Sequence, residues 1–135
     1  MKRVFADTSY WIAISWKSDQ WREQAFAASE KIGNAEIVTT ETVLIEVLNY
    51  FSEFDGYAKQ KIVLSVETIL QDENVLVLHH NHEDFLKALE LYKSRLDKGY
   101  SLTDCISMNA MRGFSIADVL TNDEHFEQEG FTKLF

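Results

Sequence analysis

Residues 3–9 of the chain read Arg3-Val4-Phe5-Ala6-Asp7-Thr8-Ser9. The apolar run predicts a short buried strand, and the acid that closes it, Asp7, is followed by short polar side chains. A similar pattern occurs near the other end of the chain, in Val119-Leu120-Thr121-Asn122-Asp123. In open α/β sheets, functional sites collect outside the carboxyl ends of strands. We therefore expect Asp7 and Asp123 to face the same crevice.

Between these two segments the sequence alternates predicted strands and helices. Strands are expected at residues 4–6, 36–39, 74–78, 116–120 and 131–135. Helices are expected at residues 9–15, from an Asp19 cap to about 31, from 40 or 42 to 51, and at 57–70, 83–96 and 101–112. Strands separated by helices pair in parallel. This order therefore predicts an α/β fold, a three-layer helix–sheet–helix sandwich with a central, mostly parallel sheet.

The composition favours a single soluble domain over residues 1–135. Hydrophobic content is 46% and charged content is 26%, which is ordinary for a globular chain. No apolar run suggests a membrane span or a signal peptide, and the single cysteine, Cys105, fits a reducing compartment. We therefore expect a cytoplasmic protein. The net charge of −9 argues against a simple nucleic-acid binder, but it leaves a nuclease possible because bound cations reverse the local sign.

Four acids are the candidate catalytic and metal-binding residues: Asp7, Glu46, Asp104 and Asp123. Each also has an ordinary explanation, because Asp7, Asp104 and Asp123 could cap helices and Glu46 could lie on a solvated face. Gathering all four would cost repulsion unless a cation compensates. Oxygen ligands of this kind suit Mg²⁺ or Mn²⁺. The pattern indicates metal-assisted cleavage of phosphodiester bonds.

Polar residues beside the acids are candidates for a supporting role. Thr8, Ser9 and Asn122 could orient the metal ligands or contact substrate phosphate, or they could simply cap the backbone. His125 could contact phosphate or fix its loop. A local concentration of basic residues precedes Asp104, and it could guide a substrate or form a solvated helix face: Lys87, Lys93, Arg95 and Lys98.

Four segments of the chain resemble the motifs of the PIN-domain family, specifically the VapC-type toxin ribonucleases of toxin–antitoxin pairs. They are residues 4–11, 40–49, 101–105 and 119–126, the last followed by Gly130-Phe131, and each contains one of the four acids. The resemblance implies a PIN-like sheet flanked by helices and an endoribonuclease that depends on Mg²⁺ or Mn²⁺. It also implies a homodimer and a small antitoxin that occupies the active-site groove. The matching functional positions are Asp7, Glu46, Asp104 and Asp123.

Other hypotheses remain open at this stage. The chain could be a free-standing RNA-processing PIN nuclease, a nuclease that cleaves DNA, or a binding module without turnover. An aspartyl phosphatase is disfavoured because residue 9 is serine rather than a second aspartate, and no phosphate-binding glycine loop occurs. His79 and His80 should point to opposite faces of a strand, which disfavours a zinc site. The three tryptophans are expected to pack internally or in a dimer rather than stack on bases.

Overall fold

A five-stranded parallel sheet forms the centre of the protein, whose computed structural model describes residues 2–135. The strands are β1 (Arg3–Ala6), β2 (Glu36–Thr40), β3 (Val75–Leu78), β4 (Asp118–Leu120) and β5 (Thr132–Lys133). Their order is β3-β2-β1-β4-β5, and every neighbouring pair is parallel. The predicted α/β class with a parallel sheet is therefore confirmed. Because β1 lies between β2 and β4, chain connections leave it in both directions, and this is where a crevice opens.

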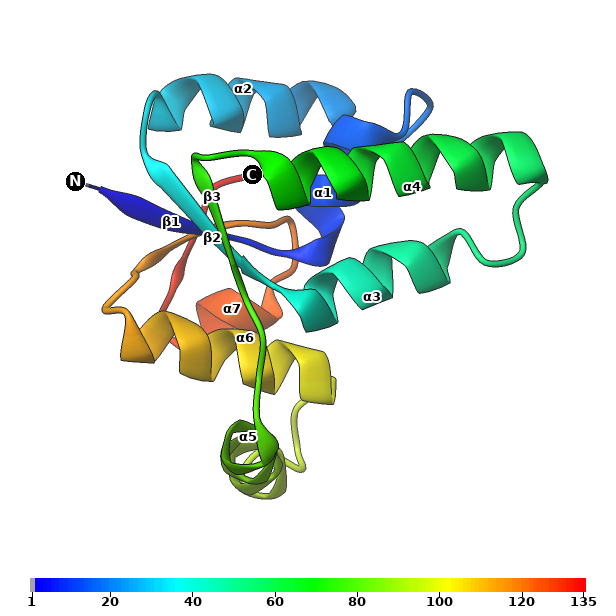
Figure 1. Cartoon of the computed structure of the whole chain (residues 1–135). Helices are drawn as coiled ribbons and strands as arrows, with labels where there is room; N and C mark the ends of the chain where they lie inside the picture. Colours follow the sequence, from blue (N-terminus) through cyan, green and yellow to red (C-terminus); the bar gives the residue numbers. More distant parts are fainter. Residues whose placement is uncertain (1) are drawn as a thin grey trace.

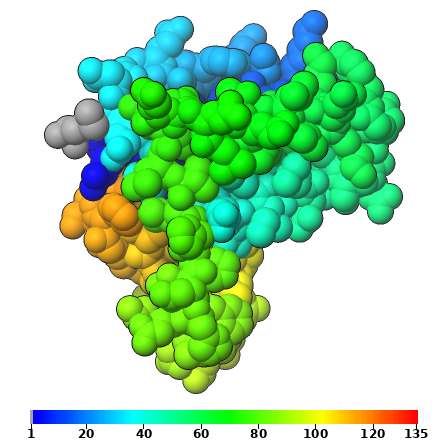
Figure 2. All heavy atoms as spheres, in the orientation of Figure 1, coloured from blue at the N-terminus to red at the C-terminus, as the bar shows by residue number. Residues whose placement is uncertain are grey.

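Seven helices flank the sheet in the part of the chain that the structure describes. They are α1 (Thr8–Ser15), α2 (Arg22–Ile32), α3 (Glu41–Tyr50), α4 (Gly56–Gln71), α5 (His82–Lys93), α6 (Leu102–Gly113) and α7 (His125–Gln128). Helices α1, α2 and α4 lie on one side of the sheet and α6 on the other, with α5 packed outside α6 (Figure 1). The α5 segment projects from the rest of the molecule (Figure 2). None of these helices has the length and apolar character that a membrane crossing requires.

Local sequence explains where the elements of the site begin. The side chains of Val4, Phe5 and Ala6 are fully buried, because helices cover both faces of the central strand. Helix α3 begins after Thr40, whose hydroxyl accepts a hydrogen bond from the Val43 amide. Helices α5 and α6 both begin with a complete capping box, formed by Asn81 with Asp84 and by Ser101 with Asp104.

Several predicted boundaries were wrong. Asp19 does not cap a helix that starts beside it: its carboxylate accepts from the Trp21 amide, and α2 begins only at Arg22. Short polar residues form such turns as readily as helix caps. Helix α5 ends at Lys93 rather than near residue 96, because the Ser94 hydroxyl bonds back to the Leu91 carbonyl. Strands β3, β4 and β5 are shorter than predicted, and β5 covers only Thr132–Lys133, whereas β1 and β2 are each one residue longer.

Candidate active site

One open cavity of about 710 Å³ lies at the carboxyl ends of β1 and β4. All eight residues selected from the sequence line it: Asp7, Thr8, Ser9, Glu46, Asp104, Asn122, Asp123 and His125. They come from the loops after β1 and β4 and from helices α1, α3, α6 and α7. The structure therefore brings together residues that are more than a hundred positions apart in the chain.

Asp7 is the innermost acid of this cavity. Its side chain is only 4% exposed, and although it occupies the N-cap position of α1, it accepts no capping hydrogen bond there. Instead, the hydroxyl of Thr121 donates to Asp7 Oδ2 at 2.9 Å. The same hydroxyl contacts Ser9 Oγ at 3.1 Å and accepts from the Asp123 amide at 3.1 Å. Thr121 thus joins the loops after β1 and β4, a role that the sequence analysis missed.

Glu46 and Asp104 reach the cavity from two helices. Glu46 lies in the middle of α3, and the hydroxyl of Thr8 donates to its carboxylate. Asp104 lies in the first turn of α6, where its Oδ2 accepts from the Ser101 amide at 3.0 Å. The capping explanation for Asp104 is therefore correct, but its position in the cavity shows that capping is not all that its carboxylate can do.

Asp104, Asp123 and His125 form a compact group within the cavity. His125 Nδ1 lies 3.1 Å from Asp104 Oδ2 and 3.3 Å from Asp123 Oδ1. The backbone amide of His125 also donates to Asp123 Oδ1, at 2.9 Å. Each residue offers one ligand atom, and these atoms lie within 4.8 Å of one another. Among residues 2–135 this is the only group of three or more such side chains that could hold one metal ion.

The electrostatics of the cavity disfavour charge on its buried acids. Burial raises the pKa of Asp7 to about 7, and the negative charges of Asp104 and Glu46 add to the effect. The pKa of Asp104 is also raised, by burial and by the charge of Asp123. Among residues 2–135, no lysine or arginine lines the cavity. The chain itself therefore supplies no permanent cation beside these carboxylates.

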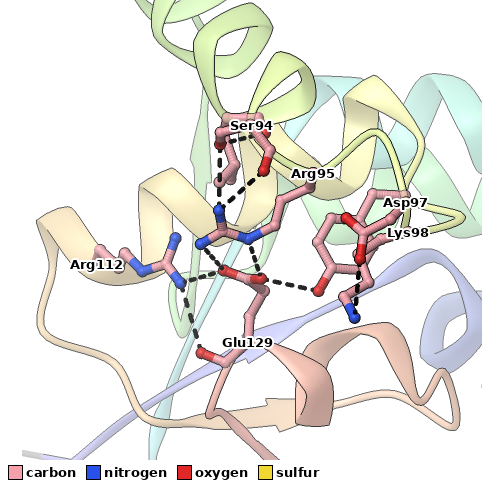
Figure 3. A network of polar contacts seen from close by, with 8 residues as sticks. Ser94, Arg95, Asp97, Lys98, Arg112 and Glu129 are labelled. Carbon is pink, nitrogen blue, oxygen red and sulfur yellow. Dashed lines mark hydrogen bonds and ion pairs between the residues drawn. The ribbon is translucent and has the colours of Figure 1, made fainter.

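A second buried carboxylate, that of Glu129, has the opposite surroundings (Figure 3). Its side chain is 5% exposed. Arg95 Nε lies 2.7 Å and Arg112 Nη2 2.8 Å from the carboxylate oxygens, and the Tyr100 hydroxyl donates at 2.9 Å. Although burial opposes ionisation, hydrogen bonds from these three groups lower the pKa of Glu129 to about 2.

The basic stretch before α6 is therefore mostly engaged within the chain. Arg95 is held by Glu129, Lys93 pairs with Glu90 on the same helix, and Lys98 pairs with Asp97. The two lysine pairs are exposed to solvent and thus weak. The structure gives no support to Arg95 as a residue that guides substrate.

Two other groups singled out in the sequence lie elsewhere. His79 and His80 follow the end of β3 and border a separate cavity of about 350 Å³ between β3, α5 and α6. The alternation argument fails because neither residue belongs to the strand. Trp11 is 3% exposed and donates to the Thr39 hydroxyl, so it is internal as predicted. Trp16 is partly buried and packs on Phe51, whereas Trp21 is 37% exposed and is not internal in this chain.

The donor set of the larger cavity fits a divalent cation. Carboxylate oxygens are the ligands that Mg²⁺ and Mn²⁺ prefer, and a cation would offset the cost of charging buried acids. The pKa values of Asp7 and Asp104 are raised, as expected for a cation site in which the protein supplies no positive charge of its own. Asp104 and Asp123 lie close enough, with His125, to share one ion, whereas Asp7 and Glu46 lie outside this group and could reach the ion through water.

Comparisons with known proteins agree with this fold. VapC20 from Mycobacterium tuberculosis, described as a sarcin–ricin loop cleaving toxin, superimposes with a TM-score of 0.86 at 23% identity, over 96% of this chain and 97% of that one. FitAcB from Neisseria gonorrhoeae superimposes with a TM-score of 0.64 at 14% identity, over 98% and 96% of the two chains. No curated protein sequence gives a match. The family model of the PIN domain matches residues 4–131, and the chain therefore belongs to the PIN domain family.

Proposed function

We propose that this protein is a metal-dependent endoribonuclease, and that it is the toxin of a toxin–antitoxin pair. The single observation that carries the proposal is the cavity itself. Four carboxylates from distant segments converge there, two of them buried, and no lysine or arginine of the described residues lines it. The mutual repulsion of such a gathering costs stability, so we infer that it serves cation binding and catalysis.

The residues of the chain have separable roles in this proposal. Asp7, Glu46, Asp104 and Asp123 would hold Mg²⁺ or Mn²⁺. When bound, the cation supplies hydroxide near neutral pH and stabilises charge on the scissile phosphate. Thr121 fixes the Asp7 carboxylate, and Thr8 fixes that of Glu46, so that the oxygens stay in place without reorganisation.

Phosphate can enter from the side lined by Ser9 and Asn122. The backbone amide of Asn122, rather than its side chain, donates to Ser9 Oγ at 3.3 Å. The Asn122 side chain can therefore contact the substrate. Both side chains are part-exposed in the cavity wall. The cavity is open rather than enclosed, so a single-stranded loop or end of RNA has access to it, as sequence-specific RNA recognition generally requires.

A partner protein is supported by the surface beside the cavity. Helix α3 and the start of α4 expose large apolar side chains, of which Tyr57 is 68%, Tyr50 is 55% and Ile45 is 53% exposed. Exposed apolar patches of this kind commonly mark protein contacts. Since Glu46 lies on the same helix, a small antitoxin bound here would also cover the site. We include a homodimer in the proposal, and light scattering of the purified chain tests it.

The test is cleavage of labelled RNA by protein freed of any co-purified partner. The substrates are a hairpin with the sarcin–ricin loop sequence, an unstructured RNA and the matching DNA, each with Mn²⁺, with Mg²⁺ and with EDTA. Asp104→Asn should abolish cleavage. Asp84→Asn is the matched control, because Asp84 occupies the same capping-box position in α5 but lies outside the active-site cavity. Cleavage that survives EDTA or Asp104→Asn contradicts the proposal, and cleavage of DNA in preference to RNA redirects it to a deoxyribonuclease.

A further inference from the structure

The side chain of His125 has a geometry that hydrogen bonding explains only in part. Its Nδ1 lies nearly midway between two carboxylate oxygens, 3.1 Å from Asp104 Oδ2 and 3.3 Å from Asp123 Oδ1. A ring nitrogen that carries a proton can direct it at only one acceptor in the ideal geometry. Ligand atoms that share one six-coordinate ion with bonds of about 2.1 Å stand about 3 Å apart. Both spacings therefore fit neighbouring ligands of a single ion.

The ring is held in this orientation from three sides. Its own backbone amide is fixed by Asp123 Oδ1 at 2.9 Å. The Tyr100 ring lies against it with centroids 5.3 Å apart, and Tyr100 is itself anchored to Glu129. On the third side the backbone of Gly99 approaches so closely that a Cβ there would lie 3.3 Å from His125 Nε2. Because the ring is already ordered, cation binding costs little side-chain entropy.

Coordination through Nδ1 sets a requirement on the other ring nitrogen, Nε2. A metal ligand must present a lone pair, so coordination through Nδ1 places the ring proton on Nε2. His125 Nε2 makes no hydrogen bond within residues 2–135, and the side chain is 29% exposed. Solvent can therefore accept the Nε2 proton, and no other residue has to move.

From this geometry we propose that His125 is a direct nitrogen ligand, with Asp104 and Asp123, of the cation in this cavity, and that it makes the site prefer Mn²⁺ to Mg²⁺. Mg²⁺ is a hard ion that favours oxygen and retains its waters, whereas imidazole suits transition metals. A site made of carboxylates alone would discriminate little between Mn²⁺ and Mg²⁺, because it offers no nitrogen ligand. The inference rests on the proposed function, since it concerns the same cavity, but it can be tested without any RNA.

The test is pulsed electron paramagnetic resonance of Mn²⁺ bound to the RNA-free protein, with calorimetric titration of Mn²⁺ and Mg²⁺. Coordinated histidine nitrogen gives a characteristic modulation, which changes when the histidines are labelled with ¹⁵N. We expect the modulation in the parent protein and its loss in His125→Gln, which keeps a polar side chain of similar reach. His125→Gln should weaken Mn²⁺ about tenfold or more and Mg²⁺ far less. His80→Gln, which changes a histidine in the other cavity, should alter neither quantity.

The outcomes separate this inference from the proposed function. Mn²⁺ bound without nitrogen modulation, or with modulation that survives in His125→Gln, overturns the role of His125 and leaves a nuclease with an all-oxygen site. An equal loss of affinity for both metals overturns the stated preference. Absence of histidine nitrogen modulation in the parent protein is enough to overturn the inference, so it stays testable even if His125→Gln folds poorly. Failure of the proposed function appears separately, as absence of RNA cleavage with metal bound.

Discussion

Two buried carboxylate sites in this protein stand in opposite electrostatic surroundings. Glu129 is met by two guanidinium groups and a phenol, and its pKa falls to about 2. Asp7 is more deeply buried and meets two further acids, and its pKa rises to about 7. The chain has therefore placed counter-charges beside the acid that ties its elements together and has left them out where a cation from solution could bind. Burial alone does not distinguish a functional acid from a structural one, whereas burial without a counter-charge makes an acid a candidate for function.

The largest effect that this comparison predicts is on catalysis. Asp7→Asn keeps an oxygen that can accept from the Thr121 hydroxyl but removes the charge that would attract the proposed cation. Loss of outer-shell partners of metal ligands costs about 10–100-fold, so we expect RNA cleavage to fall by more than about a hundredfold. Single-turnover cleavage rates measure it. Asp55→Asn, at the N-cap of α4, is the control and should cleave normally. A variant at position 7 that keeps full activity would remove Asp7 from the site.

The next largest effect is on the pH dependence of the free energy of unfolding, measured in EDTA so that no metal is bound. Folded Asp7 holds its proton up to about pH 7, while the unfolded chain releases it near the ordinary value of 3.8. The folded state therefore binds more protons between these values, and the free energy of unfolding must fall as pH rises through this window. The total is at most roughly 4 kcal/mol, at about 1.4 kcal/mol for each pKa unit.

Urea denaturation of the parent and of Asp7→Asn at pH 4.5 and pH 7.5 measures this slope. The variant should be less sensitive to pH, because it has no charge to bury at position 7. Excess Mn²⁺ should also remove part of the loss in the parent at pH 7.5, since a ligand that binds only the folded state stabilises it. Equal slopes in both proteins would show that Asp7 is not the acid whose burial costs stability.

A smaller effect of opposite sign is expected from the compensated acid. Glu129→Gln removes the negative charge between Arg95 and Arg112 and should destabilise the protein by about 1–3 kcal/mol at pH 7. The value is modest because both arginines are partly exposed, at 37% and 43%. The contribution of Glu129 is fully present above its ordinary pKa of 4.5 and is lost as pH falls towards about 2.

The difference between the parent and Glu129→Gln should therefore shrink steadily below pH 4.5. Denaturation curves at pH 7, 4 and 3 measure the trend. Glu127→Gln, an exposed acid on the same short helix, is the control and should have little effect at any pH. A difference that stayed constant in acid would mean that packing, rather than charge pairing, makes Glu129 important.

Sequence reasoning reached one of these two regions and missed the other. The acids of the cavity were accessible because Asp7 and Asp123 follow apolar strands and Asp104 follows a serine at capping distance, so local pattern and sheet topology place them at one edge. The pairing of Glu129 with Arg95 and Arg112 has no local signal, because it joins the end of α7 to the ends of two other helices. Only the packed fold brings these residues together.

Thr121 illustrates the same limit inside the cavity. It follows β4 directly, as Thr8 follows Asp7, so its position near the site was predictable. Its role was not, because one hydroxyl that bonds Asp7, Ser9 and the Asp123 amide depends on the exact separation of two loops. Periodicity predicts which face a side chain occupies, but hydrogen-bond networks depend on distances of a few tenths of an ångström.

The smallest predicted effect extends the comparison to uncharged groups. Ser107 and Thr39 are both fully buried, yet within residues 2–135 the Ser107 hydroxyl has no hydrogen-bond partner, whereas the Thr39 hydroxyl accepts from Trp11 and donates to the Ala6 carbonyl. Ser107→Ala should therefore stabilise the protein by about 0.5–1 kcal/mol, and Thr39→Val should destabilise it by about 1–2 kcal/mol, as thermal and urea unfolding can measure. If both substitutions destabilised equally, a buried polar group without a partner would not be costly here, and the argument from the uncompensated acids to a cation site would lose its physical basis.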